Sequence, residues 1–524
     1  MIPLFSAQQV RDADNYAINN LGIPGIVLME NASLNVFNSI IKKYGEVYHL
    51  NTVGVLAGKG NNGGDGFAIA RHFINYGSDV IVIALGEEEE LRGDALTNYR
   101  ILKNLIQSRE KSKIITYTQE KDLTAISNCS LIIDAMLGTG TRGELSDPYK
   151  SIVEFVNDLG SIKVAVDLPT GLDLNNAVGS TIFKADLTIT LAELKTGLFY
   201  GDGIGNVGEV EKGSIGMGQG YFESLEVTDF LIEPEDAFVG LPEKSIDDYK
   251  YSAGKVLVIA GSGSYTGAGV LSAESVLKAG AGACFLAVPG SIQQLMQHKL
   301  KEVITLKYED ENTGYLRTEN IDEISEKIDW TDVIAIGPGL GREETTLEAV
   351  NEVLSTGKDK KFVIDADALY GLHNGKYKQL KSKSKVFTPH HKEFSDLLEI
   401  SLPELKNDLL KFGKDFAVET KSFLVLKGAP TIIFNPSGEA FINTTGNPGM
   451  AKFGTGDVLT GVIAGFLAQS DSIEDAVIAA VYLHSLSADL LMYEMTEYGF
   501  TATEIMENLP YAIKFIRDTF IQDI

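Results

Sequence analysis

The sequence has few cysteines, a shortage of basic residues and no long uninterrupted apolar run. Its 524 residues include two cysteines, Cys129 and Cys284, each in an apolar stretch. This number excludes a disulfide framework, and no Cys-x-x-Cys or Cys/His zinc spacing occurs. The most apolar long window, residues 270–289, is interrupted by Glu274 and Lys278, which excludes a membrane span. The first residues lack the pattern of a signal peptide, so we expect a cytoplasmic protein.

Charge and composition narrow the possible ligands. Acidic residues outnumber basic ones by 72 to 45, which gives a formal charge of −27. Such a chain repels nucleic acids and anionic membranes, so we expect neither as a partner. A pocket for one phosphorylated ligand remains possible, because helix N-termini and backbone amides can bind phosphate without basic side chains. The 44% hydrophobic and 22% charged residues are typical of globular domains.

Short β-branched runs alternate with longer helical stretches along nearly the whole chain. This alternation predicts an α/β protein whose sheets are mostly parallel and covered by helices on both faces. A glycine-rich stretch over 201–220 divides two such series, and we place the domain boundary at residue 221, giving domains 1–221 and 222–524. The halves share no loop motif, which indicates a fusion and not a duplication. The expected strands are Thr52–Ala57, Asp79–Leu85, Leu131–Ala135, Lys163–Asp167 and Asp186–Leu191, then Lys255–Ala260, Ala283–Val288, Asp332–Ile336, Phe362–Asp365, Lys385–Thr388 and Phe423–Leu426.

A glycine-rich loop follows the first expected strand and opens a helix. Residues 58–63 (Gly-Lys-Gly-Asn-Asn-Gly) meet the G-x-G-x-x-G pattern of dinucleotide-binding loops. The pattern alone is weak, since a tight strand-to-helix turn also needs glycine. The amides and the carboxylate of Asn61, Asn62 and Asp65 strengthen the functional interpretation, because polar groups crowded on a strained loop cost folding energy unless they bind something.

Two further loops leave the ends of strands in the same half. Asp134 leads into a glycine-rich segment, residues 138–144, and Asp167 begins the segment 167–171 (Asp-Leu-Pro-Thr-Gly). Loops at the carboxyl ends of parallel strands line one crevice, so we expect these segments to converge with the first loop. Asn62, Asp134 and Thr170 would then offer oxygen ligands with a single negative charge. This set suits an alkali cation better than a transition metal; taken singly, each aspartate could equally be a helix cap or a loop brace.

These segments resemble the epimerase domain of the NAD(P)H-hydrate repair enzymes over about the first 215 residues. That family has a Rossmann-like, three-layer αβα fold and interconverts the R and S epimers of hydrated NADH and NADPH. Fold alone does not prove activity, because non-catalytic scaffold proteins also use this domain. The resemblance implies a potassium ion at Asn62, Asp134 and Thr170, Asp167 as acid/base, and a hydrate held by Asn61, Asn62, Gly63, Gly64 and Asp65 and by Gly138, Thr139, Gly140, Thr141, Arg142, Gly143 and Glu144.

The second half contains a glycine-rich helix start. The segment 443–457 precedes a strongly apolar stretch, residues 458–467. Free backbone amides at a helix start, unobstructed beside Gly454 and Gly456, form an anion hole. Asp457 at the same start could accept a proton from a hydroxyl while the amides hold phosphoryl oxygens. A plain helix cap is the alternative, and the sequence is not a Walker A loop.

Three more polar motifs follow the ends of other expected strands in this half. They are Gly-Pro-Gly-Leu-Gly at 337–341, Asp-Ala-Asp-Ala at 365–368 and Thr-Pro-His at 388–390. Lys427 begins another such loop and could place an ammonium near a nucleotide phosphate. His390 could be structural, and its neighbour His391 does not indicate zinc, since no third ligand has suitable spacing.

Together these signals resemble the ribokinase-like superfamily, and specifically the ADP/ATP-dependent NAD(P)H-hydrate dehydratase, from about Pro234 to the C-terminus. The resemblance implies a second αβα domain that converts S-NAD(P)HX, with ADP or ATP, to NAD(P)H. With ADP the other products are AMP and phosphate, and magnesium accompanies the nucleotide. The implied hydrate contacts are Gly339, His390 and Asp457, and the implied nucleotide contacts are Lys427, Gly428, Ala429, Pro430, Thr431 and Gly456.

The sequence leaves two other functions open. One is a ribokinase-type vitamin or sugar kinase fused to a nucleotide-binding domain. The other is a non-catalytic dinucleotide sensor, against which the presence of both Asp167 and Asp457 argues. We also expect a homo-oligomer. The sequence does not decide between ADP and ATP, or between NADHX and NADPHX.

Overall fold

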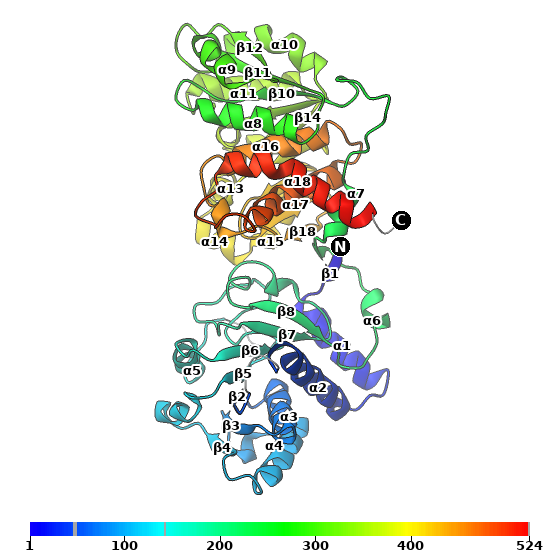
Figure 1. The fold of residues 1–524 in the computed structure, drawn as a ribbon, viewed down its shortest axis with the longest axis vertical. Coiled ribbons are helices and arrows are strands. Elements are labelled where there is room, and N and C mark those ends of the chain that lie inside the picture. Colours follow the sequence, from blue (N-terminus) through cyan, green and yellow to red (C-terminus); the bar gives the residue numbers. More distant parts are fainter. Residues whose placement is uncertain (46–49, 141–142, 522–524) are drawn as a thin grey trace. The chain divides into compact units, whose positions relative to one another are not determined.

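The computed structural model describes residues 1–45, 50–140 and 143–521, and it divides into two compact units. One unit comprises Pro3–Val227. The other comprises Thr228–Ile524 together with Met1–Ile2 at the start of the chain. Both units are α/β structures (Figure 1), so the predicted fold class is confirmed. The units divide six residues beyond the predicted boundary at 221.

The N-terminal unit contains a sheet of seven strands in the order β4-β3-β2-β5-β6-β7-β8, and every neighbouring pair is parallel. Its helices lie beside the sheet in Figure 1. The strands are β2 (Thr52–Ala57), β3 (Asp79–Ala84), β4 (Lys113–Thr116), β5 (Leu131–Ala135), β6 (Ile162–Val166), β7 (Leu187–Leu191) and β8 (Glu209–Gly213); the helices are α1 (Ala7–Asn19), α2 (Gly25–Tyr44), α3 (Asn61–Tyr76), α4 (Gly93–Ile106), α5 (Tyr149–Asn157) and α6 (Gly220–Glu223).

Two hydrophobic clusters cover the two faces of this sheet. Val53 and Val55 of β2 belong to the cluster that includes apolar residues of α2, α3 and α4. Leu56 of the same strand belongs to the other cluster, which includes residues of α5. Because successive side chains of a strand point to opposite faces, a strand packed on both faces is apolar throughout. This is why β2 could be located from the sequence as a continuous apolar run.

The C-terminal unit contains a mixed sheet of eleven strands in the order β1-β9-β18-β17-β16-β15-β14-β13-β10-β11-β12. The pairs β16–β17 and β17–β18 are antiparallel. The strands are β1 (Ile2–Leu4), β9 (Asp229–Leu231), β10 (Lys255–Ile259), β11 (Ala283–Pro289), β12 (Ile304–Tyr308), β13 (Val333–Ile336), β14 (Lys361–Ile364), β15 (Lys385–Phe387), β16 (Phe423–Leu426), β17 (Thr431–Phe434) and β18 (Ala440–Asn443).

Apolar helices pack against this sheet. Val458 and Val462 of α16 and Val477 of α17 belong to one cluster with Val256 of β10 and Val333 of β13. No described helix has the length and apolar character needed to cross a bilayer. The helices are α7 (Pro234–Val239), α8 (Thr266–Lys278), α9 (Gln293–Lys299), α10 (Ile321–Trp330), α11 (Glu344–Thr356), α12 (Asp367–Tyr370), α13 (His391–Leu398), α14 (Leu402–Asn407), α15 (Leu409–Thr420), α16 (Thr455–Leu467), α17 (Ile473–Leu491) and α18 (Ala502–Ile521).

Candidate active sites

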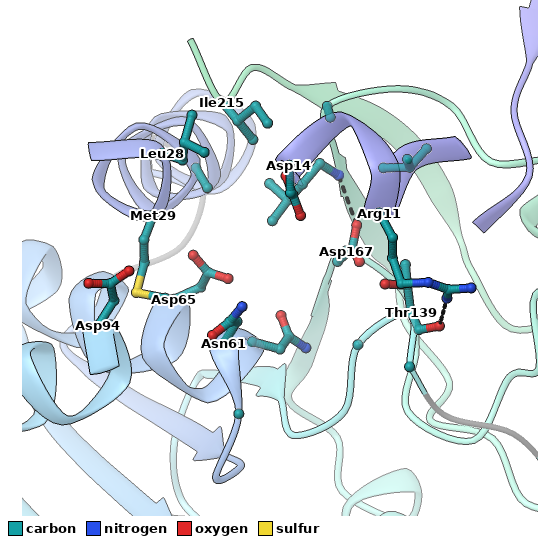
Figure 2. Close-up of a pocket in the computed structure, with 18 of the residues that line it drawn as sticks. Arg11, Asp14, Leu28, Met29, Asn61, Asp65, Asp94, Thr139, Asp167 and Ile215 are labelled. Carbon is teal, nitrogen blue, oxygen red and sulfur yellow. Dashed lines mark hydrogen bonds between the residues drawn. The ribbon is translucent and has the colours of Figure 1, made fainter. Parts of the chain in front are cut away.

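A cavity of about 580 Å³ opens at the carboxyl ends of β2, β5 and β6 in the N-terminal unit (Figure 2). Its walls come from α1, α2, the start of α3 and the loops that follow β5 and β6. The predicted loops therefore converge as parallel-sheet topology requires. Of the residues predicted to bind here, those that line the cavity are Asn61, Asn62, Asp65, Gly138, Thr139, Gly140 and Asp167.

Other predicted residues do not line this cavity in the part of the chain that the structure describes. Gly63, Gly64, Gly143 and Glu144 are not among its lining residues, and Thr141 and Arg142 lie outside the described residues. Gly63 has a packing role, since a Cβ at this position would lie 1.9 Å from the carbonyl oxygen of Gly58. The loop and helix α3 approach too closely for any side chain there.

Asp134, Thr170 and Asn62 form a buried polar cluster at the base of the loops. The Thr170 amide and hydroxyl donate to the two Asp134 carboxyl oxygens over 2.7 and 2.8 Å. The Asn62 Nδ2 donates to the Leu137 carbonyl over 2.9 Å, while the buried Asn62 Oδ1 has no hydrogen-bond partner among the residues that the structure describes. Burial raises the pKa of Asp134 to about 6, although the hydrogen bonds from Thr170 and Met136 lower it. The cluster thus presents a fully buried carboxyl and an unpaired amide oxygen.

Asp167 is held at the cavity wall by a buried lysine. It directly follows β6 and has a φ of 71°, a conformation that non-glycine residues adopt at a cost and that is common at functional sites. The Lys195 Nζ donates to Asp167 Oδ1 over 2.7 Å, and the Leu191 amide donates to the same oxygen over 3.1 Å. The Lys195 side chain is 0% exposed. These contacts fix the carboxylate through Oδ1. Its second oxygen, Oδ2, lies near Gly138.

Three more carboxyl groups, those of Asp14, Asp65 and Asp94, share this cavity with Asp167. Asp14 of α1 and Asp65 of α3 line it from different walls (Figure 2). Burial raises the pKa of Asp65 well above its ordinary range, and the charges of Asp167 and Asp14 raise it further. Partial burial and then the charge of Asp167 raise the pKa of Asp14 to about 6, although Lys195 lowers it. The cavity therefore contains carboxyl groups with different affinities for protons.

The candidate site of the C-terminal unit lies at the start of α16. Gly454 precedes the helix with a φ of 92°, a left-handed conformation suited to glycine. Asp457 lies in the first turn, where backbone amides have no partners within the helix. Burial raises the pKa of Asp457 to about 7, and the charges of Asp365 and Asp367 also raise it while Lys427 lowers it. The carboxyl group is thus poised to change protonation near neutral pH.

Lys427 and Asp365 form a buried ion pair beside this helix start. The Lys427 Nζ lies 2.6 Å from Asp365 Oδ1, and the Thr460 hydroxyl donates to Asp365 Oδ2 over 2.6 Å. The Lys427 Nζ also lies 3.4 Å from the position that a Cβ on Gly456 would occupy. Burial lowers the pKa of Lys427, but Asp365, Glu393 and Asp457 outweigh it and the net shift is upward. A charged ammonium therefore lies beside the amides of α16.

The remaining predicted residues occupy strand-end loops around this pair. His390 precedes α13 and accepts a hydrogen bond at Nδ1 from the Glu393 amide over 3.0 Å. The Lys427 amide donates to the Pro389 carbonyl over 2.9 Å, which brings this loop beside Lys427. Gly339 has a φ of 61° in the loop after β13. The predicted nucleotide-binding residues Gly428, Ala429 and Pro430 connect β16 to β17, where Thr431 begins β17.

The sequence analysis missed three residues that contact the predicted groups or line the same cavity. Lys195 and Asp14 belong to the N-terminal site, and Thr460 belongs to the C-terminal one. A lone lysine in the stretch Leu-Lys-Thr-Gly-Leu was a usable signal, because a buried lysine requires a partner. Asp14 offered no such signal, since an aspartate within a helix that also carries other polar residues is common.

Comparison with known proteins assigns both units. The NAD(P)H-hydrate dehydratase family matches residues 256–511, and the family described as the YjeF-related protein N-terminus matches residues 25–197. The bifunctional NAD(P)H-hydrate repair enzyme Nnr of Moorella thermoacetica is 34% identical over 524 residues, covering 98% of this chain and 97% of that protein. The corresponding protein of Thermofilum pendens is 32% identical over 98% of this chain and 96% of its own length.

A solved structure is similar to the C-terminal unit. The ADP/ATP-dependent NAD(P)H-hydrate dehydratase of Bacillus subtilis, co-crystallised with ATP and Mg²⁺, is 28% identical, with a TM-score of 0.47 over 55% of this chain and 98% of that one. The class of protein is an α/β enzyme with a parallel-sheet N-terminal domain and a C-terminal domain of the NAD(P)H-hydrate dehydratase family. The chain belongs to the family of bifunctional NAD(P)H-hydrate repair enzymes.

Proposed function

We propose that this chain restores hydrated NADH and NADPH in two steps, one in each unit. The N-terminal unit interconverts the R and S epimers of NAD(P)HX, and the C-terminal unit dehydrates the S epimer with the help of a nucleotide. The observation that carries this proposal is the similarity to bifunctional repair enzymes along 98% of the chain. The geometry supports it, because Asp167 directly follows β6 at the cavity of one unit and Asp457 lies in the first turn of α16 in the other.

In the epimerase site, we assign Asp167 as the acid/base that acts on the hydrated ring. Its strained backbone and its anchoring to Lys195 support this role, because a catalytic group needs a fixed geometry. The hydrate is held by the loops Asn61–Asp65 and Gly138–Glu144. Asn61 at the start of α3 and Gly138 beside Asp167 have cavity-lining positions suited to this contact.

We propose that Asn62, Asp134 and Thr170 hold a potassium ion. The donors fit an alkali cation because they are oxygens with one carboxylate among them, and Asn62 Oδ1 is buried with no hydrogen-bond partner in the described part of the chain. When bound, the ion supplies positive charge beneath the loops that hold the hydrate. The protein contributes the buried cage and the hydrogen bonds that orient Thr170 and Asp134.

In the dehydratase site, phosphoryl transfer converts a poor leaving group into a good one. Asp457 accepts the proton of the C6 hydroxyl, whose oxygen attacks the terminal phosphorus of ADP and displaces AMP. The amides beside Gly454 and Gly456 and the Lys427 ammonium stabilise the phosphoryl charge. The ring nitrogen then expels phosphate from C6, and loss of a C5 proton restores the dihydronicotinamide. Magnesium neutralises phosphate charge when it accompanies the nucleotide.

The remaining contacts assigned to this site follow from its loops. His390 and Gly339 contact the hydrate, while residues 427–431 and Gly456 contact the nucleotide. Support comes from the hydrogen bond between the Lys427 amide and the Pro389 carbonyl, which places the His390 loop beside the Lys427 loop. Hydrate and nucleotide could therefore meet near Asp457.

The proposed function is tested with a mixture of R- and S-NADHX and ADP. Recovery of absorbance near 340 nm, accompanied by AMP and phosphate, is the expected result. Accumulation of a phosphorylated vitamin or sugar, with no NADH formed, would establish a kinase. Binding of the hydrate without turnover of either epimer would establish a dinucleotide sensor.

We further propose a cytoplasmic homo-oligomer with the two activities separable near residue 221. Separate fragments 1–221 and 222–524 should then each carry one activity, because the units have hydrophobic cores of their own. A soluble second fragment that dehydrates neither epimer would contradict this boundary. Sedimentation velocity of the full chain measures the oligomeric state, and a monomer at micromolar concentration would contradict the oligomer.

A further inference from the structure

The carboxyl group of Asp14 lines the N-terminal cavity and has no structural role in the contacts described above. It projects from α1 into the cavity on the same side as Asp167, and Figure 2 shows the two as neighbours. Among the described residues, no hydrogen bond engages the Asp14 side chain. Asp167, in contrast, is fixed through Oδ1 by Lys195 and by the Leu191 amide. The wall therefore presents one anchored carboxylate beside one that is free to exchange a proton.

The groups around Asp14 favour the protonated form of its carboxyl group. Asp167 lies beside it, and Asp65 and Asp94 line the opposite part of the cavity. The positive groups are Lys195, Arg11 and Lys59, and Lys59 forms an ion pair with Glu90. Lys195 is paired with Asp167, and Arg11 donates to the Thr139 carbonyl. The residue as a whole is exposed to solvent, but desolvation of its carboxyl group at the cavity wall and the charge of Asp167 raise the pKa of Asp14 to about 6, although Lys195 lowers it. A group can act efficiently as both proton donor and acceptor when its pKa lies near the working pH.

Asp65 and Asp94 are less suited to this exchange. Asp65 is 7% exposed, and burial together with the charges of Asp167 and Asp14 raises its pKa well above the ordinary range, which favours its protonated form. The Asp94 Oδ2 lies 2.5 Å from the position that a Cβ on Gly25 would occupy, so it packs at the start of α2. Of the three carboxyl groups that accompany Asp167, Asp14 is the one that adjoins it without a fixed partner.

We propose that Asp14 is a second catalytic residue of the N-terminal site and acts as the acid partner of Asp167. This inference rests on the proposed epimerisation and names a group that this function does not by itself require. A neighbouring carboxylate and carboxylic acid on one wall suit the opening of a ring at a carbon that carries both a hydroxyl group and the ring nitrogen. The hydroxyl oxygen and the ring nitrogen both exchange a proton in this reaction, and each then has its own carboxyl group to exchange it with.

The step balances without any further reactant. Asp167 accepts the C6 hydroxyl proton, the oxygen electrons form a carbonyl, and the N1–C6 bond breaks with its electron pair on N1, which takes the proton of Asp14. Rotation about the C5–C6 bond presents the other face of the carbonyl to N1. The nitrogen then attacks that face, its proton returns to Asp14, and Asp167 returns a proton to the oxygen. Both residues end in their starting protonation states, and the hydroxyl configuration is inverted.

The test compares Asp14→Asn with Asp12→Asn in the full-length protein. Asp12 is an exposed residue of the same helix whose carboxyl accepts a hydrogen bond from Gln8 Nε2, so it serves as a matched control. Interconversion of purified R-NADHX and S-NADHX is followed directly, without ADP. Asp14→Asn should lower kcat about 10²-fold or more, as loss of an acid requires, while Asp12→Asn leaves it unchanged. S-epimer dehydration, measured in the same samples, should stay at the parent level and reports a folded protein.

Two further measurements separate a catalytic role from a structural one. The double variant Asp14→Asn/Asp167→Asn should be no slower than Asp167→Asn alone, because groups that act as a unit are strongly non-additive. The rate for the parent should fall as pH rises beyond about 6, where Asp14 loses its proton, and Asp14→Asn should lack this decline. A parent that epimerises alongside an equally active Asp14→Asn variant overturns the role of Asp14 alone. A parent that epimerises neither hydrate overturns the proposed function, and this inference with it.

Discussion

The two sites use similar components in opposite arrangements. In the N-terminal unit, the buried lysine pairs with the candidate catalytic aspartate itself, since Lys195 contacts Asp167 over 2.7 Å. In the C-terminal unit, the lysine pairs with another aspartate, since Lys427 contacts Asp365 over 2.6 Å. Asp457 is left without an ion-pair partner in the described residues, and its pKa rises to about 7. A lysine thus fixes a carboxylate in one site and leaves one free to take up a proton in the other.

In both sites, a non-glycine residue just after a strand has a strained backbone conformation. Asp167 follows β6 with a φ of 71°, and Ala366 follows Asp365 and β14 with a φ of 46°. Non-glycine residues in such conformations cost of order 1–3 kcal/mol and persist where the surroundings hold them. In both units the strained residue lies next to or within the lysine–aspartate pair, so the ion pair and the strand-end turn support one geometry.

The largest expected effect follows from removing the unpaired carboxylate. Asp457→Asn preserves the shape and the helix start but removes the base, so dehydration of S-NADHX should slow by about 10²–10⁴-fold. Nucleotide affinity should change little, because Lys427 and the amide of Gly456 are untouched. Epimerisation of R-NADHX by the same sample is the control, and its loss would show that the change had damaged the whole protein. Dehydration within a few-fold of the parent rate would contradict the assignment of Asp457.

The next prediction tests how much the buried ion pair of Lys427 stabilises the C-terminal unit. Lys427→Met leaves the carboxylate of Asp365, whose side chain is 1% exposed, buried without a cation. Breaking such a pair destabilises by about 3–5 kcal/mol, which denaturant unfolding of the C-terminal unit should detect. Lys392→Met, which removes an exposed ion pair with Asp396, is the control and should cost less than about 1 kcal/mol. Equal stabilities of the two variants would show that the buried pair is not structural.

The comparison also shows what the sequence could and could not predict. The strand-end loops that carry Asp134 and Thr170 were located because buried parallel strands are continuous apolar runs, and their hydrogen bonds in the structure agree with that convergence. The partners Lys195 and Asp14 were missed because they come from a turn and a helix outside those strand ends. Tertiary folding brings Lys195 to a residue 28 positions earlier, and no local pattern encodes that separation.

The peripheral strands were missed for a different physical reason. The edge strands β4, β8 and β12, the antiparallel strands β17 and β18 and the short strands β1 and β9 were not expected. Strand β17 lies five residues after β16 and reads as a continuation of a glycine-containing loop, since Gly428 and Pro430 separate them. A parallel, helix-separated pattern indicates the centre of such a sheet better than its edges, where β4, β8 and β12 are partly exposed. Strands β17 and β18 are buried, but they are antiparallel and no helix separates them.

The third prediction concerns the pH dependence of dehydration. Asp457 acts as a base only when ionised, and its pKa is raised to about 7 by burial and by Asp365. The value of kcat/KM for the S epimer should therefore fall about tenfold per pH unit below pH 7 and level off above it. Steady-state measurements from pH 5.5 to about 8.5 test this slope. A rate independent of pH through this range would mean that Asp457 is not the titrating base.

The smallest expected effect concerns the cation proposed at Asn62, Asp134 and Thr170. Exchange into a buffer free of potassium and sodium should slow epimerisation while leaving the fold of the N-terminal unit intact. Returning potassium should restore the rate, whereas zinc or manganese should not, because the donors are oxygens only. Asp134→Asn, which removes the single carboxylate, should abolish the dependence on potassium. Epimerisation that continues unchanged after exhaustive exchange would contradict this site.

The central claim is that two independent sites on one chain divide the repair between them. The most direct test supplies an equal mixture of R- and S-NADHX with ADP and follows NADH at 340 nm for three samples: Asp167→Asn, Asp457→Asn, and both variants together. The account predicts that Asp167→Asn stops once the S epimer is consumed, that Asp457→Asn forms almost no NADH, and that the mixed sample converts the whole supply. A mixed sample that stops where Asp167→Asn alone stops, or an Asp167→Asn variant that consumes both epimers at the parent rate, would contradict it.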